Sequence, residues 1–245
     1  MLLAVDTSTP QIGLALYDGA QVLAESLWTS KARHTVELAP SVAEMLAHTG
    51  IKIDDIQALG VAIGPGSFTS LRVGLSFVKG LALARSLPTV GVNTLDVVAA
   101  SQPAIRLPLG CILPAGRGRL ALGWYRAKNN GWQATGSPGI VSAEALSTSI
   151  ERDSVLCGDL SAAERSILQN NPKIRLVSAA LSTRRPGILA ELAYTRWQAG
   201  QTDAIDALAP IYLHIAEPIP AIASGTFPAE PSQQEHSGLS GKTRS

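Results

Sequence analysis

Short apolar runs and amphipathic segments alternate along the first hundred residues of the chain. The apolar runs predict strands at residues 2–5, 12–17, 21–28, 58–63 and 89–92. Apolar residues spaced three and four positions apart predict helices over residues 35–48 and 69–85. Asp18-Gly19, between the second and third runs, is typical of a two-residue hairpin turn. The predicted order β-β-β-α-β-α-β is that of a ribonuclease-H-like half, in which parallel strands extend an antiparallel meander.

A second and weaker unit of the same kind follows. Its apolar runs predict strands at residues 109–113, 119–125, 132–135 and 155–157. Asn130-Gly131 is the expected turn between the second and third of these strands. Helices are expected to begin at Ser142 and to cover residues 187–199.

These patterns divide the chain into three parts. Residues 1–101 are predicted to form an N-terminal ribonuclease-H-like lobe, and residues 102–215 a smaller, degenerate lobe. Residues 216–245 lose the periodicity and fill with Pro, Ser, Gly and Gln, so we expect a disordered tail. The fold class is therefore α/β, with two ribonuclease-H-like lobes.

Composition narrows the classes of function. The net charge of +1 gives no sign that the chain holds nucleic acid by itself. Cys111 and Cys157 each lie inside an apolar stretch, which predicts buried, reduced thiols. The N-terminus has no basic segment before its apolar run, and no uninterrupted apolar run reaches the ~18 residues of a membrane span. We expect a soluble, cytoplasmic protein without membrane contact.

The first strand ends in the polar sequence Asp6-Thr7-Ser8-Thr9. This corner resembles the first phosphate-binding corner of the actin-like ATPase superfamily, which includes acetate and sugar kinases, Hsp70 and actin. A nucleotide site of that class also needs a second acidic corner and a glycine-rich adenosine loop. Gly158-Asp159 is the one candidate for the second corner, and no Gly-Gly pair follows it. An ATP-dependent small-molecule kinase or phosphotransferase is therefore one alternative.

Other chemistries find less support in the sequence. No lysine closes a G-x-x-x-x-G spacing, so there is no Walker A motif. The GPGSF sequence lacks the G-x-S-x-G arrangement of a nucleophile elbow. The four histidines are scattered, so no metal site is predicted. A peptidase acting on a partner is a further alternative, for which no nucleophile and base pair was found.

Several stretches together resemble the TsaB (YeaZ) family. They are residues 2–9, the histidine before the first helix, GPGSFTSLRVGLSFVKGLA at 64–82, VGVNTLDVVAA at 90–100 and PIYLH at 210–214. The resemblance is strong over residues 1–100 and looser over 101–215. The sequence departs from the family at two places. Ser70 stands where the family usually has Gly, and Pro114-Ala115-Gly116-Arg117 replaces a usual Asp-Ala-Arg turn. The second departure leaves the role of that loop open, with Arg117 as a substitute for the usual arginine.

The family resemblance implies a non-catalytic partner in a heterodimer. TsaB binds TsaD, with the ATPase TsaE, in synthesis of N6-threonylcarbamoyladenosine at position 37 of tRNA, and tRNA is reached through the complex. In TsaD a His-x-x-x-His pair binds metal beside the nucleotide. His34 and Leu38 occupy that spacing here, so one ligand is absent. The resemblance thus implies no catalytic residue and no cofactor in this chain, with ATP and metal in the partner subunit.

The glycine-rich sequence is then expected to build an interface helix. The phosphate corner Asp6, Thr7, Ser8 and Thr9 would be vestigial, and the structural loop would consist of Gly64, Pro65, Gly66, Ser67 and Thr69, with Ser67 or Thr69 capping the helix. The helix carries two apolar stripes, one of which needs a cover other than the sheet. That cover is either a partner or the rest of a two-domain core. We predict that the partner interface contains Leu38, Val42, Met45, Leu71, Arg72, Leu75 and Val78. Without TsaD, the same surface could pair two copies as a homodimer.

Overall fold

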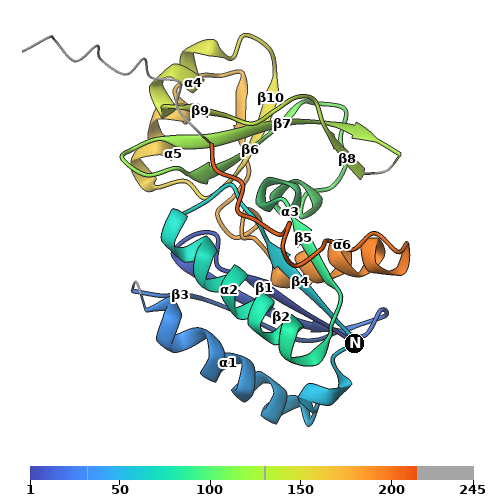
Figure 1. The fold of residues 1–245 in the computed structure, drawn as a ribbon. Coiled ribbons are helices and arrows are strands. Elements are labelled where there is room, and N and C mark those ends of the chain that lie inside the picture. Colours follow the sequence, from blue (N-terminus) through green and yellow to red (C-terminus); the bar gives the residue numbers. More distant parts are fainter. Residues whose placement is uncertain (32, 130, 214–245) are drawn as a thin grey trace, which may run out of the picture. The chain divides into compact units, whose positions relative to one another are not determined.

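A five-stranded sheet lies at the centre of the first half of the chain (Figure 1). The structure is a computed structural model and describes residues 1–31, 33–129 and 131–213. The strands are β1 (Leu2–Asp6), β2 (Gln11–Tyr17), β3 (Val22–Thr29), β4 (Ala58–Ala62) and β5 (Thr89–Val92), in the order β3-β2-β1-β4-β5. β1, β2 and β3 are antiparallel, whereas β4 and β5 run parallel to β1. The predicted strands and the hairpin at Asp18 are confirmed.

The second sheet repeats this topology. Its strands are β6 (Leu109–Pro114), β7 (Leu120–Lys128), β8 (Gly131–Ala134), β9 (Gly139–Val141), β10 (Ser154–Gly158) and β11 (Ile174–Leu176). β6, β7 and β8 form the antiparallel meander, and β10 and β11 extend it in parallel on the other side of β6. β9 is an addition that pairs with β7. The repeated strand order confirms a fold of two ribonuclease-H-like units.

Six α-helices accompany the two sheets in the described part of the chain. They are α1 (His34–Thr49), α2 (Phe68–Arg85), α3 (Thr94–Ala100), α4 (Ala143–Ser149), α5 (Ala162–Gln169) and α6 (Pro186–Gln198), together with a short 3-10 helix, η1 (Ile53–Asp55). The sequence analysis did not predict α3, α5, β9 or β11. α3 is buried almost all round, so it lacks the polar face that would reveal its period. α5 does carry a readable signal, because Ser161 and Glu164 form a capping box.

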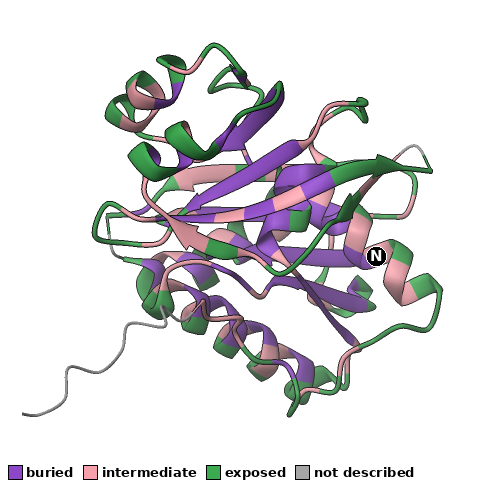
Figure 2. Cartoon of the chain, turned by 90° about the horizontal axis from the view of Figure 1, so that it is seen from above, coloured by how far each residue is buried: buried purple, intermediate pink, exposed green. Residues whose placement is uncertain are grey.

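β1 and β4 of the first sheet are buried along their whole length. Figure 2 shows buried residues, in purple, along the central strands of the molecule. Alternate residues of β1 belong to different cores: Leu3 and Val5 pack with α1 and α2, whereas Leu2 and Ala4 pack with α6. A Cβ atom at Gly60 would lie 2.7 Å from the Cβ atom of Ala193, so α6 approaches β4 closely. α6 thus covers the first sheet although its residues fall within the range 102–215 assigned to the second lobe. The predicted tail, 216–245, lies outside the described residues.

Six of the seven residues predicted for the partner interface have a place inside the chain itself. Leu38, Val42, Met45, Leu71, Leu75 and Val78 are all buried within the chain. They form the inner stripes of α1 and α2, which cover the same sheet face and touch each other. The sequence showed two apolar stripes on α2, and the stripe chosen for the partner is the one that faces the core. Only Arg72 is exposed, with its guanidinium 3.8 Å from the centre of the Phe68 ring.

Replacing Leu75 with glutamate is therefore expected to unfold the protein. Leu75 is 4% exposed in the core under α2, where a carboxylate would have no partner. We expect a loss above about 4 kcal/mol, a large part of a typical domain's stability. Ser76→Glu is the matched control, because Ser76 is exposed on the next position of the same helix, and it should change stability by about 0.5 kcal/mol or less. Urea unfolding followed by circular dichroism measures both; a folded Leu75→Glu variant would contradict the packing.

Candidate functional site

Three loops meet where β1, β4 and β10 end. Asp6 is the last residue of β1, the GPGS sequence follows β4, and Asp159 directly follows β10. In open α/β sheets, the carboxyl ends of parallel strands are the usual place for a ligand. The structure thus brings together Asp6 and Asp159, the two acidic corners considered in the sequence.

Hydrogen bonds within the corner hold the residues after β1. One carboxylate oxygen of Asp6, Oδ1, accepts from the backbone N–H of Ser8 at 2.8 Å and from its hydroxyl at 2.5 Å. The Thr7 hydroxyl donates to the carbonyl of Ser70 at 2.7 Å and accepts from the backbone N–H of Gly74 at 3.1 Å. All four residues from Asp6 to Thr9 are buried. The corner is therefore tied to the start of α2.

The glycine-rich loop packs directly on this corner. The backbone N–H of Ser67 donates to the carbonyl of Ser8 at 2.7 Å. A Cβ atom at Gly66 would collide with that same carbonyl, so only glycine allows this approach. Ser67 is the N-cap of α2, as predicted, since its side chain accepts from the backbone N–H of Ser70. Thr69, the other predicted cap, is the second residue of the helix. The loop thus fixes α2 against β1.

A buried arginine joins the two acidic corners. Arg184 has a side chain that is 1% exposed, and its Nε donates to Oδ2 of Asp6 at 3.0 Å. Its Nη1 bonds the carboxylate of Asp159, and its Nη2 donates to the hydroxyl of Thr9 at 2.7 Å. Burial alone would lower the pKa of Arg184, but the attraction of Asp6 and Asp159 outweighs it and raises the pKa above its ordinary value. The guanidinium stays charged between two carboxylates.

Arg184 was not predicted as a residue of this site. It lies between β11 and α6, 178 residues from Asp6, and the residues around it in the sequence carry no sign of a buried site. No local motif distinguishes Arg184 from its neighbour Arg185, which pairs with Glu25 and is largely exposed. Only the return of the chain to the first sheet through α6 brings Arg184 to the corner.

His34 lies beside the same loops. Its Nε2 donates to the carbonyl of Thr9 at 3.1 Å, and the ring is buried at the start of α1. Leu38, one turn later, packs in the core. A cavity of about 360 Å³ adjoins His34, Ser67 and Ser70. Within the described residues, no three His, Cys, Asp or Glu side chains come close enough to hold a metal ion.

The turn between β6 and β7 lies across a cavity from the glycine-rich loop. Pro114 and Gly116 line this cavity of about 540 Å³ together with Thr9, Gly66 and Tyr212. Arg117, the residue suggested as a substitute in this loop, is exposed with a positive φ of 53°. Asp6 and Arg184, which bond each other, are not among the residues that line the cavity.

Comparison with known proteins agrees with this architecture. The family model described as "TsaD: tRNA N6-adenosine threonylcarbamoyltransferase" matches residues 21–193. The chain is 29% identical over 221 residues to the tRNA threonylcarbamoyladenosine biosynthesis protein TsaB of Bacillus subtilis, covering 88% of this chain and 95% of that protein. It is 39% identical over 98 residues to TsaB of Escherichia coli, but this match covers 40% of the chain and less than half, 42%, of that protein. YeaZ from Pseudomonas aeruginosa has the same fold, with a TM-score of 0.69, 23% identity, and coverage of 86% and 99% of the two chains.

The fold and the loops at the strand ends define a protein of two ribonuclease-H-like units whose acidic corners are joined by an arginine. The family model covers most of the chain. The chain belongs to the family that this model describes, and its resemblance to TsaB (YeaZ), indicated by the sequence, is confirmed by the Bacillus subtilis relative. Among the residues that the structure describes, none of the helices combines the length and apolar character that a membrane span requires.

Proposed function

We propose that the chain is a non-catalytic subunit that binds TsaD and supports threonylcarbamoyl transfer to adenosine 37 of tRNA. The family model that matches the chain is that of the transferase, and the relatives in Bacillus subtilis and Escherichia coli are named as tRNA threonylcarbamoyladenosine biosynthesis proteins. In this proposal TsaE joins the complex, tRNA reaches the chain through it, and ATP and metal are held by the partner.

The buried Arg184 is the observation that carries the non-catalytic part of the proposal. A metal-bound nucleotide needs acidic oxygens that are free to bind the metal or its waters. Here Asp6 and Asp159 both bond one fixed guanidinium. The cation position between the two corners is thus filled by the chain itself. This arrangement disfavours the alternative of an ATP-dependent kinase, which would have to break the ion pairs before each nucleotide could bind.

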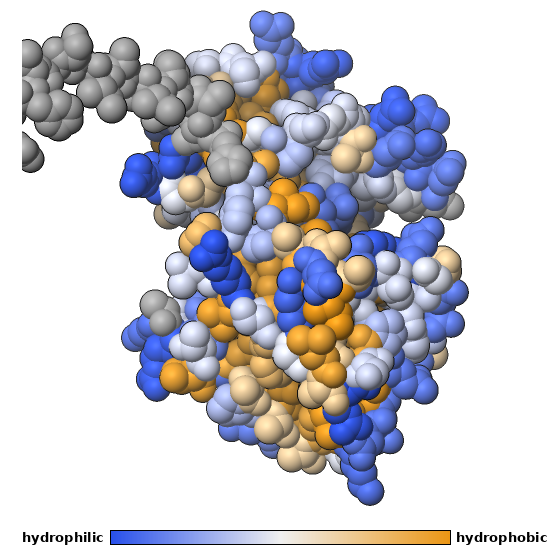
Figure 3. Space-filling model, in the orientation of Figure 1, coloured by the Kyte–Doolittle hydropathy of each residue, from blue (hydrophilic) through white to orange (hydrophobic). Residues whose placement is uncertain are grey.

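The outer surface of α1 and α2 supports the partner-binding part. We call it the α1–α2 groove, a cavity of about 450 Å³ lined by Thr35, Leu38, Ala39, Phe68, Thr69, Arg72, Val73, Ser76 and Phe77. Phe68 is 52% exposed at the start of α2, and Val36 is 56% exposed on α1. In Figure 3, apolar side chains gather over the lower part of the molecule, where Figure 1 places these two helices. An apolar surface of this kind fits a protein partner, either TsaD or a second copy of the chain.

Mixing the purified chain with TsaD tests the proposal. We expect one heterodimer peak in size-exclusion chromatography. Formation of the modified adenosine by TsaD and TsaE, given tRNA and the threonylcarbamoyl donor, should depend on adding the chain. Turnover by the chain without TsaD, or full activity of TsaD without the chain, would refute the proposal.

A further inference from the structure

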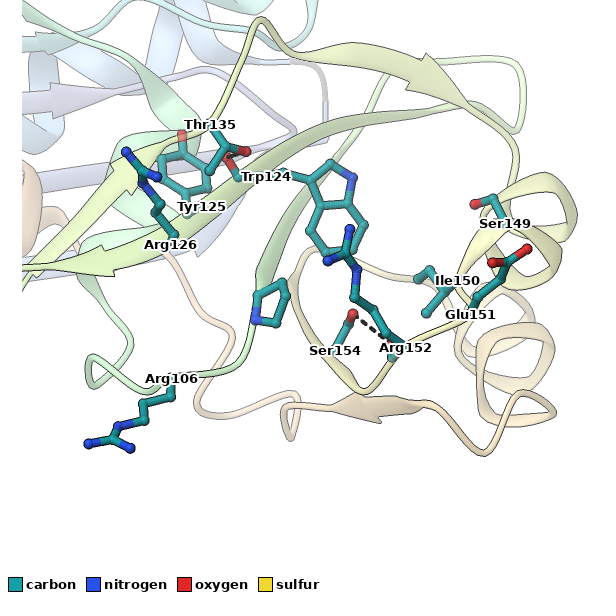
Figure 4. Close-up of a pocket in the computed structure, with 11 residues that line it drawn as sticks. Arg106, Trp124, Tyr125, Arg126, Thr135, Ser149, Ile150, Glu151, Arg152 and Ser154 are labelled. Atoms are coloured by element: carbon teal, nitrogen blue, oxygen red, sulfur yellow. Dashed lines mark hydrogen bonds between the residues drawn. The ribbon is translucent and has the colours of Figure 1, made fainter.

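A second cavity lies on the other sheet, away from the glycine-rich loop. Its volume is about 520 Å³, and we call it the β7 pocket. It is lined by Arg106, Pro108, Trp124, Tyr125, Arg126, Thr135, Ser149, Ile150, Glu151, Arg152 and Ser154. These residues come from the segment before β6, from β7, from the end of β8 and from the loop between α4 and β10 (Figure 4). None of them takes part in the network around Arg184.

Positive charge is concentrated in the β7 pocket. Three arginines line it, Arg106, Arg126 and Arg152, against one acidic residue, Glu151. The local balance of +2 exceeds the net charge of the whole chain, +1. None of the three arginines forms an ion pair with any residue that the structure describes; Arg126 reaches only the amide oxygen of Gln133, at 3.4 Å. An anion is the ligand that such unpaired guanidinium groups favour.

Trp124 gives the pocket an aromatic surface. Residues 124, 126 and 128 alternate with inward residues along β7, so Trp124, Arg126 and Lys128 lie on one face of the strand. The Tyr125 hydroxyl instead donates to Asp96 at 2.7 Å. The ring N–H groups of Trp28 and Trp132 bond Glu37 and the carbonyl of Gln102, whereas those of Trp124 and Trp197 have no acceptor among the described residues. Trp124 is thus a half-buried ring without a structural hydrogen bond.

The arrangement of these groups matches one unit of a nucleic acid strand. In Figure 4, Arg126 lies beside Trp124 on the side of Tyr125 and Thr135, the guanidinium of Arg152 overlaps the Trp124 ring in this view, and Arg106 lies at the edge of the group. A base stacked on an aromatic ring within a strand has a phosphate on each side, whereas a free nucleotide carries phosphates on one side only. Arginine pairs with phosphate through its planar guanidinium, and base stacking on an aromatic ring is independent of sequence.

We propose that the β7 pocket binds a nucleotide unit of an RNA strand, with the base on Trp124 and the flanking phosphates on the arginines. The inference that this RNA is the tRNA substrate rests on the proposed function. Contact through stacking and phosphate pairing would supply affinity without sequence readout.

Fluorescence anisotropy with the full chain tests the pocket directly. The probes are a labelled single-stranded RNA oligonucleotide and a labelled tRNA transcript, with ATP as unlabelled competitor, at low salt. The variants are Trp124→Leu, Arg126→Gln and Arg152→Gln, and all three residues lie outside the Arg184 network. Arg175→Gln is the matched control, because Arg175 is an exposed arginine of β11 in the same sheet that forms no ion pair with a described residue.

We expect the parent chain to bind both RNAs with a Kd of about 10–100 μM, typical of binding without sequence readout. Trp124→Leu should weaken binding at least about fivefold, the lower limit for loss of one stacked base. Each arginine variant should also reduce the slope of log K against log salt by about 0.7–1. Arg175→Gln should leave affinity and slope unchanged.

Three results would overturn the inference. In the first, the parent chain binds neither RNA. In the second, the pocket variants bind RNA as tightly as the parent. In the third, ATP displaces the labelled RNA at a concentration equal to that of the RNA. Binding to TsaD, measured on the same variants, separates this inference from the proposed function. Variants that lose RNA but keep TsaD support the pocket, and a parent chain that binds RNA but never TsaD would refute the proposed function alone.

Discussion

Replacing Arg184 with methionine is expected to destabilise the protein by about 3–5 kcal/mol, because removing one partner of a buried ion pair leaves the other charge uncompensated. Asp6, whose carboxylate is almost fully buried, would lose the one cationic partner it has among the described residues, and Asp159 would lose the same partner. Urea unfolding measures the change in the free energy of unfolding.

Two comparisons show whether the loss comes from the buried charge. Arg185→Met is the matched control, because the Arg185 side chain pairs with Glu25 but is 61% exposed. We expect this variant to lose about 1 kcal/mol or less of unfolding free energy. Adding Asp6→Asn to Arg184→Met should recover part of the stability, because the buried unpaired carboxylate is removed. Equal losses for Arg184→Met and Arg185→Met would show that Arg184 does not act as a buried counter-ion.

Placing a glutamate at Ala39 is expected to weaken the complex with TsaD about a thousandfold. Ala39 is exposed on α1 and lines the α1–α2 groove, so a carboxylate there would be buried without a partner in the complex. A penalty of about 4 kcal/mol corresponds to a thousandfold change in Kd. Titration calorimetry measures the affinity, and thermal unfolding should show a variant as stable as the parent, because the side chain is solvated in the free chain.

Ala145→Glu is the matched control for this prediction. Ala145 is also an exposed helical alanine, but it lies on α4 of the other sheet. We expect its TsaD affinity to equal that of the parent. If Ala39→Glu also bound like the parent, the α1–α2 groove would not be the TsaD interface.

The local features of this fold were readable in the sequence. The hairpin at Asp18, the Ser67 cap and the glycine at position 66 all depend on residues close to one another in the chain or on one residue type. The Asp6 and Asp159 corners could be found because each follows a short apolar run. Their partner could not, because Arg184 reaches them only through the path of the chain into α6.

The burial of the residues predicted for the interface has a different physical reason. Hydrophobic periodicity shows that α2 has two apolar stripes, but it does not show which one covers the sheet. Leu75 belongs to the stripe that packs inward, and Phe77 to the one that stays partly open. A sequence can thus predict that a helix has more apolar surface than packing on its sheet requires. Which apolar face packs on the sheet depends on the angle at which the loop attaches the helix.

Reconstituted tRNA modification with the Asp6→Asn/Arg184→Met double variant tests the central claim most directly. At a concentration that saturates TsaD, we predict modification within about threefold of the parent chain, because neither residue takes part in the reaction. TsaD binding by the same variant, measured alongside, shows that the complex forms. A loss of about a hundredfold or more with TsaD binding preserved, which is typical of removing a group that acts in the transition state, would contradict the claim that this chain is a non-catalytic subunit.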